Sequence, residues 1–148
     1  MGAALATVRP PAFRLPVRVY YQDTDAGGVV FHAQYLAFME RARSELLNEA
    51  GIDLARFVER HGTLFMVHRI DVRYHLPARL NDLLSVSAEV VKMRRASLVF
   101  RHRVERGDSL LVEAEVTLAL VDRDRMKPAR MPRELATALG AVHEQALK

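Results

Sequence analysis

Two carboxylates and a glycine pair stand just before the start of a helical pattern. Asp23 and Asp25 come first, the glycines at 27–28 follow, and the helical spacing begins at about His32. Glycine has no Cβ, so backbone at 27–28 can approach a ligand closely. No Ser, Thr, Asp or Asn stands at the helix start to cap it, which leaves its first N–H groups free for an oxygen anion. A carboxylate beside such donors supplies the two parts that acyl transfer requires.

Each of these residues also has a structural interpretation. On local sequence alone, Asp25 in a glycine-containing loop favours an Asx turn over catalysis. In an extended segment Asp23 would point to the same side as Asp25, but we favour a role for Asp23 as an acceptor of backbone N–H groups. The His32 side chain can orient Asp25 or a water molecule, or only satisfy local groups. The His32 backbone N–H is our candidate oxyanion donor whatever its side chain does.

Residues 23–43 resemble the signature of a known family: Asp-Thr-Asp-Ala-Gly-Gly-Val-Val-Phe-His-Ala-Gln-Tyr-Leu-Ala-Phe-Met-Glu-Arg-Ala-Arg. This is the 4-hydroxybenzoyl-CoA thioesterase family of hotdog proteins, and within it the Tol-Pal-associated acyl-CoA thioesterase branch. The resemblance continues through residues 94–100, 113–116 and 126–128 and covers about 17–135. It implies that Asp25 is the catalytic carboxylate, either as a nucleophile that forms a mixed anhydride or as a general base.

The resemblance also implies how the substrate and the subunits are arranged. Two subunits join their sheets, pairs of subunits often form tetramers, and coenzyme A lies across the subunit interface. Arg94 and Arg95 stand at a turn between strands, where guanidinium groups can hold nucleotide phosphates, and we assign them to the coenzyme with Ser97. The alternative for this turn is a solvated hairpin tip. Because the resemblance places coenzyme A across the subunit interface, these coenzyme contacts can come from the neighbouring chain.

Composition excludes several other chemistries. The chain has no cysteine, so disulfides, thiolate metal sites and a thiol nucleophile are absent. Its six histidines have no metal-ligand spacing, and neither a nucleophile-elbow Gly-x-Ser-x-Gly nor a phosphate loop occurs. We therefore expect no metal and no cofactor, with coenzyme A present only as part of the substrate. The formal charge of +4 suits an anionic partner or a solvated surface, but scattered basic residues disfavour nucleic acid.

Hydrophobic periodicity predicts an α+β chain. A strand is expected over 15–22 with Tyr21 on its inner face, a long helix over 33–50 and a short one from a cap at Asp53. Four alternating strands follow between about 66 and 122, and Pro132 precedes a helix over 133–147. The first of these four carries Met66, His68 and Ile70 on one face. A single antiparallel sheet curled around one long helix is the hotdog fold, here with five strands.

We divide the 148 residues into a mobile arm (1–14), a hotdog thioesterase domain (15–135) and a C-terminal helix or tail (136–148). No apolar run approaches the roughly 18 residues that span a bilayer, and the N-terminus lacks a signal-peptide core, so we expect a cytoplasmic protein. Glu40 and Arg43, three positions apart on the helix, are expected to form a surface or interface pair.

The leading hypothesis is therefore an acyl-CoA thioesterase that acts as a homodimer or homotetramer, with an acyl carrier protein as another acyl donor. A second hypothesis is a non-catalytic hotdog module that binds an acyl thioester or an envelope-complex partner. A hotdog dehydratase ranks last, because this loop has the thioesterase form.

Overall fold

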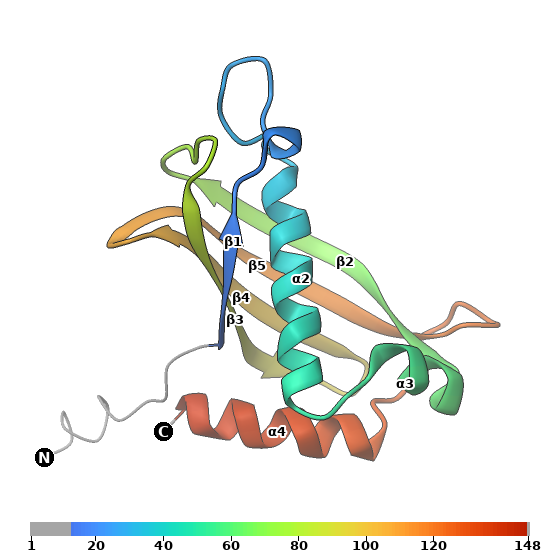
Figure 1. The fold of residues 1–148 in the computed structure, drawn as a ribbon. Coiled ribbons are helices and arrows are strands. Elements are labelled where there is room, and N and C mark those ends of the chain that lie inside the picture. The colour runs from blue at the N-terminus through green and yellow to red at the C-terminus, as the bar shows by residue number, and fades with distance from the viewer. Residues whose placement is uncertain (1–12, 148) are drawn as a thin grey trace, which may run out of the picture.

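A five-stranded antiparallel sheet curls around one long helix in the computed structural model, which describes residues 13–147, with only the backbone described beyond residue 140 (Figure 1). The strand order is β1-β3-β4-β5-β2, so β1 and β2 are the edges. This is the predicted hotdog arrangement. The elements are β1 (Phe13–Arg18), η1 (Tyr21–Asp23), α2 (Gln34–Glu49), α3 (Leu54–His61), β2 (Thr63–Tyr74), β3 (Leu83–Met93), β4 (Ser97–Arg106), β5 (Ser109–Asp122) and α4 (Arg133–Leu147).

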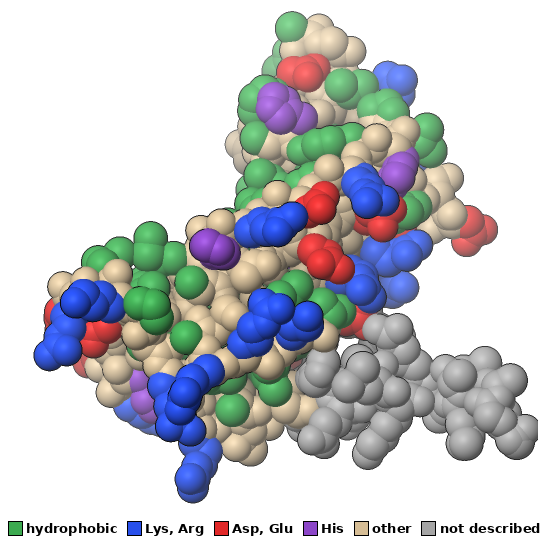
Figure 2. All heavy atoms as spheres, turned by 180° about the vertical axis from the view of Figure 1, so that it is seen from behind, with side chains coloured by type: hydrophobic (Ala, Val, Ile, Leu, Met, Phe, Trp, Pro, Cys, Tyr) green, Lys and Arg blue, Asp and Glu red, His purple; other side chains and the backbone are tan. Residues whose placement is uncertain are grey.

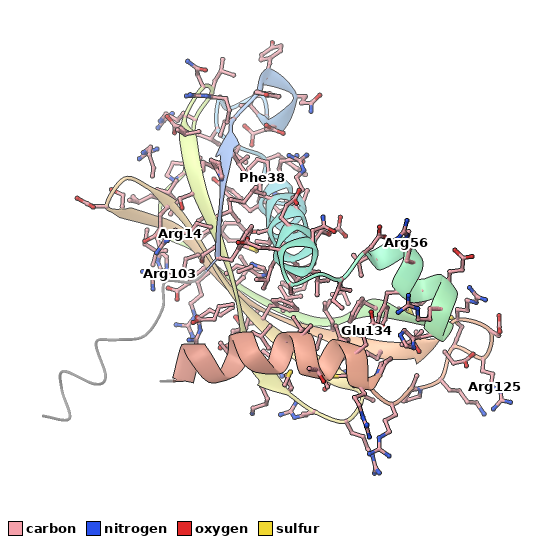
Figure 3. All side chains as sticks on the ribbon, turned by 60° about the horizontal axis from the view of Figure 1, so that its bottom comes forward. Arg14, Phe38, Arg56, Arg103, Arg125 and Glu134 are labelled. Carbon is pink, nitrogen blue, oxygen red and sulfur yellow. The ribbon has the colours of Figure 1, made fainter. Side chains whose placement is uncertain are left out.

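The core lies between α2 and the concave face of the sheet. Phe38 points from α2 into this space (Figure 3) and is fully buried, as are Phe100 of β4 and Leu120 of β5. Burial of each such side chain contributes about 2 to 3 kcal/mol. The helix is thereby fixed against the sheet along its length. Helix α2 ends as predicted before Gly51, which has a left-handed φ of 88°.

The first strand ends earlier than the periodicity predicts. β1 stops at Arg18, and residues 21–23 form a 3-10 turn instead of continuing the strand. The Asp23 carboxylate accepts a 2.8 Å hydrogen bond from the Tyr20 amide, which turns the chain out of the sheet. The inward position expected for Tyr21 is therefore wrong, since this residue is 83% exposed.

Strand β2 changes face part of the way along. Its pairing with β5 shifts register between Val67 and Arg69, so one extra residue is accommodated there. Val67 and Ile70 consequently face the same side, toward α2, where they line one groove. The expectation that Met66 and His68 share a face with Ile70 is wrong, because this bulge inverts the alternation.

The structure describes both Glu40 and Arg43 and shows no surface ion pair between them, and the alternative of an interface pair stays a prediction. Glu40 is exposed, but Arg43 is only 8% exposed and its Nη1 lies 3.1 Å from Nε2 of His102, a fully buried side chain of β4. The partner of Arg43 is 59 positions away in the chain, beyond the reach of a helical spacing rule.

Charged side chains of both signs cover the back of the sheet (Figure 2). Arg101 lies within ion-pair distance of Glu89 and Glu115, and Arg103 of Glu105. Arg101 and Arg103 are therefore matched locally by acidic side chains. Such exposed pairs each contribute at most about 1 kcal/mol.

Helix α4 packs against the same core. Leu135 and Leu139 are fully buried. Glu134, which is labelled in Figure 3, accepts 3.0 Å contacts from Arg60 and His61 of α3. Residues 1–12 of the expected arm lie outside the described part of the chain, as does Lys148. Among the described residues, every helix is too short or too polar to cross a membrane.

Candidate active site

The Gly-Gly loop is a tight, closed turn. Thr24 and Val30 form an isolated antiparallel bridge at its base. Inside this bridge the Asp25 amide donates to the Val29 carbonyl at 2.8 Å, and the Gly28 amide donates to the Asp25 carbonyl at 3.0 Å. Gly28 has φ +81°, a conformation that favours glycine. Backbone hydrogen bonds therefore fix the position from which the Asp25 side chain extends.

The Asp25 carboxylate is exposed and is held by one oxygen. Its Oδ1 accepts a 2.8 Å hydrogen bond from the Gly27 amide, which is an Asx turn. Within the described residues no other donor contacts this carboxylate, so Oδ2 is available to a substrate or a water molecule. The Asx turn expected from local sequence therefore occupies Oδ1 and leaves Oδ2 for the chemical role that the resemblance implies.

Asp23 has the structural role that we favoured. It is 3% exposed, and its carboxylate accepts from the Tyr20 amide at 2.8 Å and from Gln34 Nε2 at 2.9 Å. Its carbonyl accepts from the Phe31 amide at 2.9 Å. Asp23 therefore fastens the loop to the first residue of α2. In an extended segment, Asp23 and Asp25 would point to the same side. This expectation does not apply, because residues 21–23 form a 3-10 turn.

Helix α2 begins without a side-chain cap, as predicted. Ala33 occupies the N-cap position and makes no side-chain hydrogen bond. The Gln34 and Leu36 amides are used in the first turn by the carbonyls of Phe31 and Ala33. Within the described chain the amides of His32 and Ala33 have no acceptor. Two backbone donors are thus available at the end of the loop that carries Asp25.

The His32 side chain lies apart from this hydrogen-bond network. Its ring is exposed and packs at a tilt on Phe31, with the centroids 4.5 Å apart. In the described residues no hydrogen bond joins the imidazole to Asp25. The His32 carbonyl accepts a 2.8 Å bond from the Tyr74 hydroxyl, which orients the peptide at this position.

Residues that the sequence reasoning missed hold the loop against the turn between β2 and β3. The Val30 amide donates to the Ala78 carbonyl at 2.9 Å, and the Ala78 amide donates to the Tyr35 hydroxyl at 3.0 Å. Burial raises the pKa of Tyr35 and keeps its hydroxyl neutral. Tyr35 was identifiable only as an apolar helix position, since its polar contact is made by backbone far away in the sequence.

The candidate coenzyme residues lie at the other end of the sheet. Arg94 and Arg95 are exposed at the turn after β3, and Ser97 opens β4. The loop docks on the turn that leads into β3, where the Val30 amide donates to the Ala78 carbonyl and Val29 bridges to Arg79. Eleven strand residues separate the two ends, which corresponds to about 35 Å. One subunit therefore does not bring Arg94 or Arg95 to Asp25.

Metal chemistry has no evident site in the described part of the chain, where no group of three or more His, Asp or Glu side chains converges. The expectation that neither metal nor cofactor is required stays a prediction.

Comparisons with known proteins agree on one family. Residues 27–117 match the family model described as the thioesterase superfamily. The chain is 48% identical over 125 residues to the acyl-CoA thioester hydrolase YbgC of Escherichia coli O6:H1, across 83% of this chain and 92% of that protein. It is 43% identical to the acyl-CoA thioesterase YbgC of Haemophilus influenzae, across 85% and 93%. A probable thioesterase from Bartonella henselae has a solved structure with a TM-score of 0.78 and 32% identity, covering 82% of this chain and all of that one.

Proposed function

The chain belongs to the thioesterase superfamily, and from this premise we propose that it hydrolyses an acyl-CoA to a carboxylic acid and free coenzyme A, with Asp25 as the catalytic carboxylate. One observation supports the proposal. Oδ2 of Asp25 accepts no hydrogen bond within the described residues, and the loop that carries it leads to the amides of His32 and Ala33, which have no acceptor there. The names of relatives that are 43–48% identical supply the substrate class.

Two routes use this geometry. In the first, Oδ2 of Asp25 attacks the thioester carbonyl carbon, the C–S bond breaks, coenzyme A leaves as a thiolate that takes up a proton, and water then hydrolyses the mixed anhydride. In the second, Asp25 removes a proton from water as that water attacks the same carbon. Both routes place negative charge on the former carbonyl oxygen. The Gly27 hydrogen bond leaves the reacting oxygen of Asp25 unobstructed in either case.

The amides of His32 and Ala33 are the oxyanion donors in this proposal. Their N–H groups have no acceptor within the described residues, and a helix start attracts negative charge. The hydrogen bond from Tyr74 to the His32 carbonyl stabilises the peptide orientation before substrate arrives. Because the donors are backbone groups, the His32 side chain is dispensable for this role.

A dimer through β2 completes the coenzyme site. β2 is a twelve-residue edge strand with exposed Met66, Val67 and Ile70, an unprotected edge for a soluble chain. Its end at Tyr74 lies at the loop, and its start at Thr63 lies at the opposite end of the sheet. Antiparallel pairing of two β2 strands reverses one subunit relative to the other. The partner's Arg94 and Arg95 end would then approach this subunit's Asp25.

The proposal is tested by release of free thiol from a panel of acyl-CoAs and from the matching acyl-pantetheines, which lack the nucleotide. We expect turnover of one or more acyl-CoAs. The variant Arg94→Ala/Arg95→Ala should raise KM for acyl-CoA about tenfold and leave acyl-pantetheine unchanged. Arg56→Ala, at an exposed arginine of α3, serves as the matched control.

Binding without turnover of any acyl-CoA would favour the non-catalytic module instead. If the double variant hydrolyses acyl-CoA with an unchanged KM, the two arginines do not bind the coenzyme. The proposed thioesterase reaction would not be contradicted by that result.

A further inference from the structure

A groove of about 200 Å³ runs between α2 and β2 from a point close to the proposed oxyanion donors. Leu36 lies at its near end, only about 6 Å along the helix axis from His32 at 1.5 Å per residue. Val67 and Ile70 form the strand wall, and Val116 contributes from β5. Glu40 and Arg43 are the polar residues of an otherwise mainly apolar lining, and the groove begins within about one helical turn of the proposed oxyanion donors, where an acyl group is expected.

A second groove of about 360 Å³ continues toward α3. Its apolar walls include Leu54, Val58 and Leu64. The residues that line both grooves are Glu40, Arg43 and Val67. The two spaces are therefore neighbours, and a long acyl chain could enter the second only by passing these three side chains.

Arg43 is fixed in place from the sheet side. Its Nη1 lies 3.1 Å from His102 Nε2, and His102 Nδ1 lies 2.8 Å from the Ser87 carbonyl oxygen. A guanidinium only donates, so Nε2 accepts, and Nδ1 carries the proton that it donates to Ser87. No carboxylate in the described residues lies within ion-pair distance of Arg43. Among the described side chains no buried nitrogen lacks a partner, so the other Arg43 nitrogens keep contact with water.

An alkyl chain that passed Arg43 would remove this water and offer no hydrogen bond in return, which disfavours its passage. An apolar cavity of about 150 Å³ holds a benzene molecule, so the first groove has room for a single ring or roughly eight carbons. We propose that Arg43 ends the acyl site and is a specificity-determining residue, which admits short or single-ring acyl groups and rejects long aliphatic ones. The proposal rests on the proposed thioesterase function.

The test compares kcat/KM for hexanoyl-, benzoyl- and palmitoyl-CoA in three proteins. The wild type should prefer hexanoyl- or benzoyl-CoA over palmitoyl-CoA by at least about tenfold. The double variant Arg43→Met/His102→Leu replaces both polar partners by apolar groups, a change that cores tolerate better than removal of one. It should raise kcat/KM for palmitoyl-CoA at least about tenfold and leave the short substrates within about threefold.

Val58→Trp, which fills the second groove, is the matched control. It should leave the wild-type profile unchanged and cancel the gain when added to the double variant. Palmitoyl-CoA hydrolysed by the wild type as well as hexanoyl-CoA, or a folded double variant with an unaltered profile, would overturn the proposal. If the double variant does not fold, a loss of palmitoyl-CoA turnover in Val58→Trp alone would also overturn it. Absence of turnover with every acyl-CoA would refute the proposed function itself, and this inference with it.

Discussion

A Cβ at residue 27 would stand 3.2 Å from Oδ1 of Asp25, the oxygen to which the Gly27 amide donates its 2.8 Å hydrogen bond. That separation is tighter than ordinary van der Waals contact, so a side chain at 27 must displace the carboxylate or the loop. Gly27 is thus needed for space, whereas Gly28 has open space around it and is needed for its φ of +81°. The two neighbouring glycines have different roles.

Gly27→Ala should therefore lower kcat about tenfold, because a displacement of a few tenths of an ångström misaligns the carboxylate. Gly28→Ala should instead lower the unfolding free energy by about 1 kcal/mol through backbone strain. Thiol-release kinetics and urea unfolding of both variants separate the two effects. Full activity in Gly27→Ala would show that the close approach to Asp25 has no part in catalysis.

Asp23→Asn should weaken the connection between the loop and α2. The Tyr20 amide and Gln34 Nε2 donate to different oxygens of Asp23, and the substitution replaces one of these oxygens by an NH2 group that only donates. We expect the unfolding free energy to fall by about 2 kcal/mol, with a loss of activity. Asp124→Asn, at a side chain that is 86% exposed, is the control. Equal stabilities for the two variants in urea would contradict this role for Asp23.

Tyr35→Phe removes the hydroxyl that accepts from the Ala78 amide. The protein should lose about 1 kcal/mol of stability, and amide hydrogen exchange should accelerate at residues 76–82 and in the docked loop. Tyr21→Phe, at a fully solvated ring, should change neither quantity. Unaltered exchange at Ala78 in Tyr35→Phe would show that the loop is held by other contacts.

Stability should depend on pH through His102. Burial, and then the charge of Arg43, lower the pKa of this imidazole from 6.5 to about 4. Between pH 6.5 and 4 the unfolded chain binds a proton that the folded chain does not, so stability falls as pH falls through this window and levels off below it. The loss amounts to about 3 kcal/mol.

This pH dependence is tested by measuring the unfolding free energy of the wild type and of His102→Gln in urea from pH 8 to pH 4. Carboxylates titrate in both proteins, so the difference between their curves isolates His102. We expect the difference to appear mainly between pH 6.5 and 4. Parallel curves would mean that His102 is protonated as readily in the folded chain as in the unfolded one.

The order and types of the long elements could be predicted because periodicity and local signals agree. Asp53 caps α3 by accepting from the Arg56 amide, and Gly62 ends that helix with φ +63°, both as local rules predict. The uncapped start of α2 was likewise predictable, since a cap depends on the residues at the helix end.

The errors have tertiary causes. Tyr21 turned outward because the Asp23 carboxylate binds the Tyr20 amide, and Met66 changed face because β2 has a bulge against β5. Arg43 is buried because its guanidinium contacts the His102 imidazole of β4. Alternation within a single strand or helix contains none of this information. The catalytic role of Asp25 and the coenzyme role of Arg94 and Arg95 remain predictions. The fold adds that these two arginines must act on the active site of a partner subunit if they bind the coenzyme.

Thiol release by Asp25→Asn, measured with the best wild-type substrate, tests whether Asp25 is the catalytic carboxylate. The substitution keeps the shape and the acceptor for the Gly27 amide but removes the charge. With Asp124→Asn as control, we expect kcat/KM to fall at least about a hundredfold in Asp25→Asn alone, a loss of about 2.7 kcal/mol of transition-state stabilisation. A folded Asp25→Asn protein that turns over like the wild type would contradict the assignment.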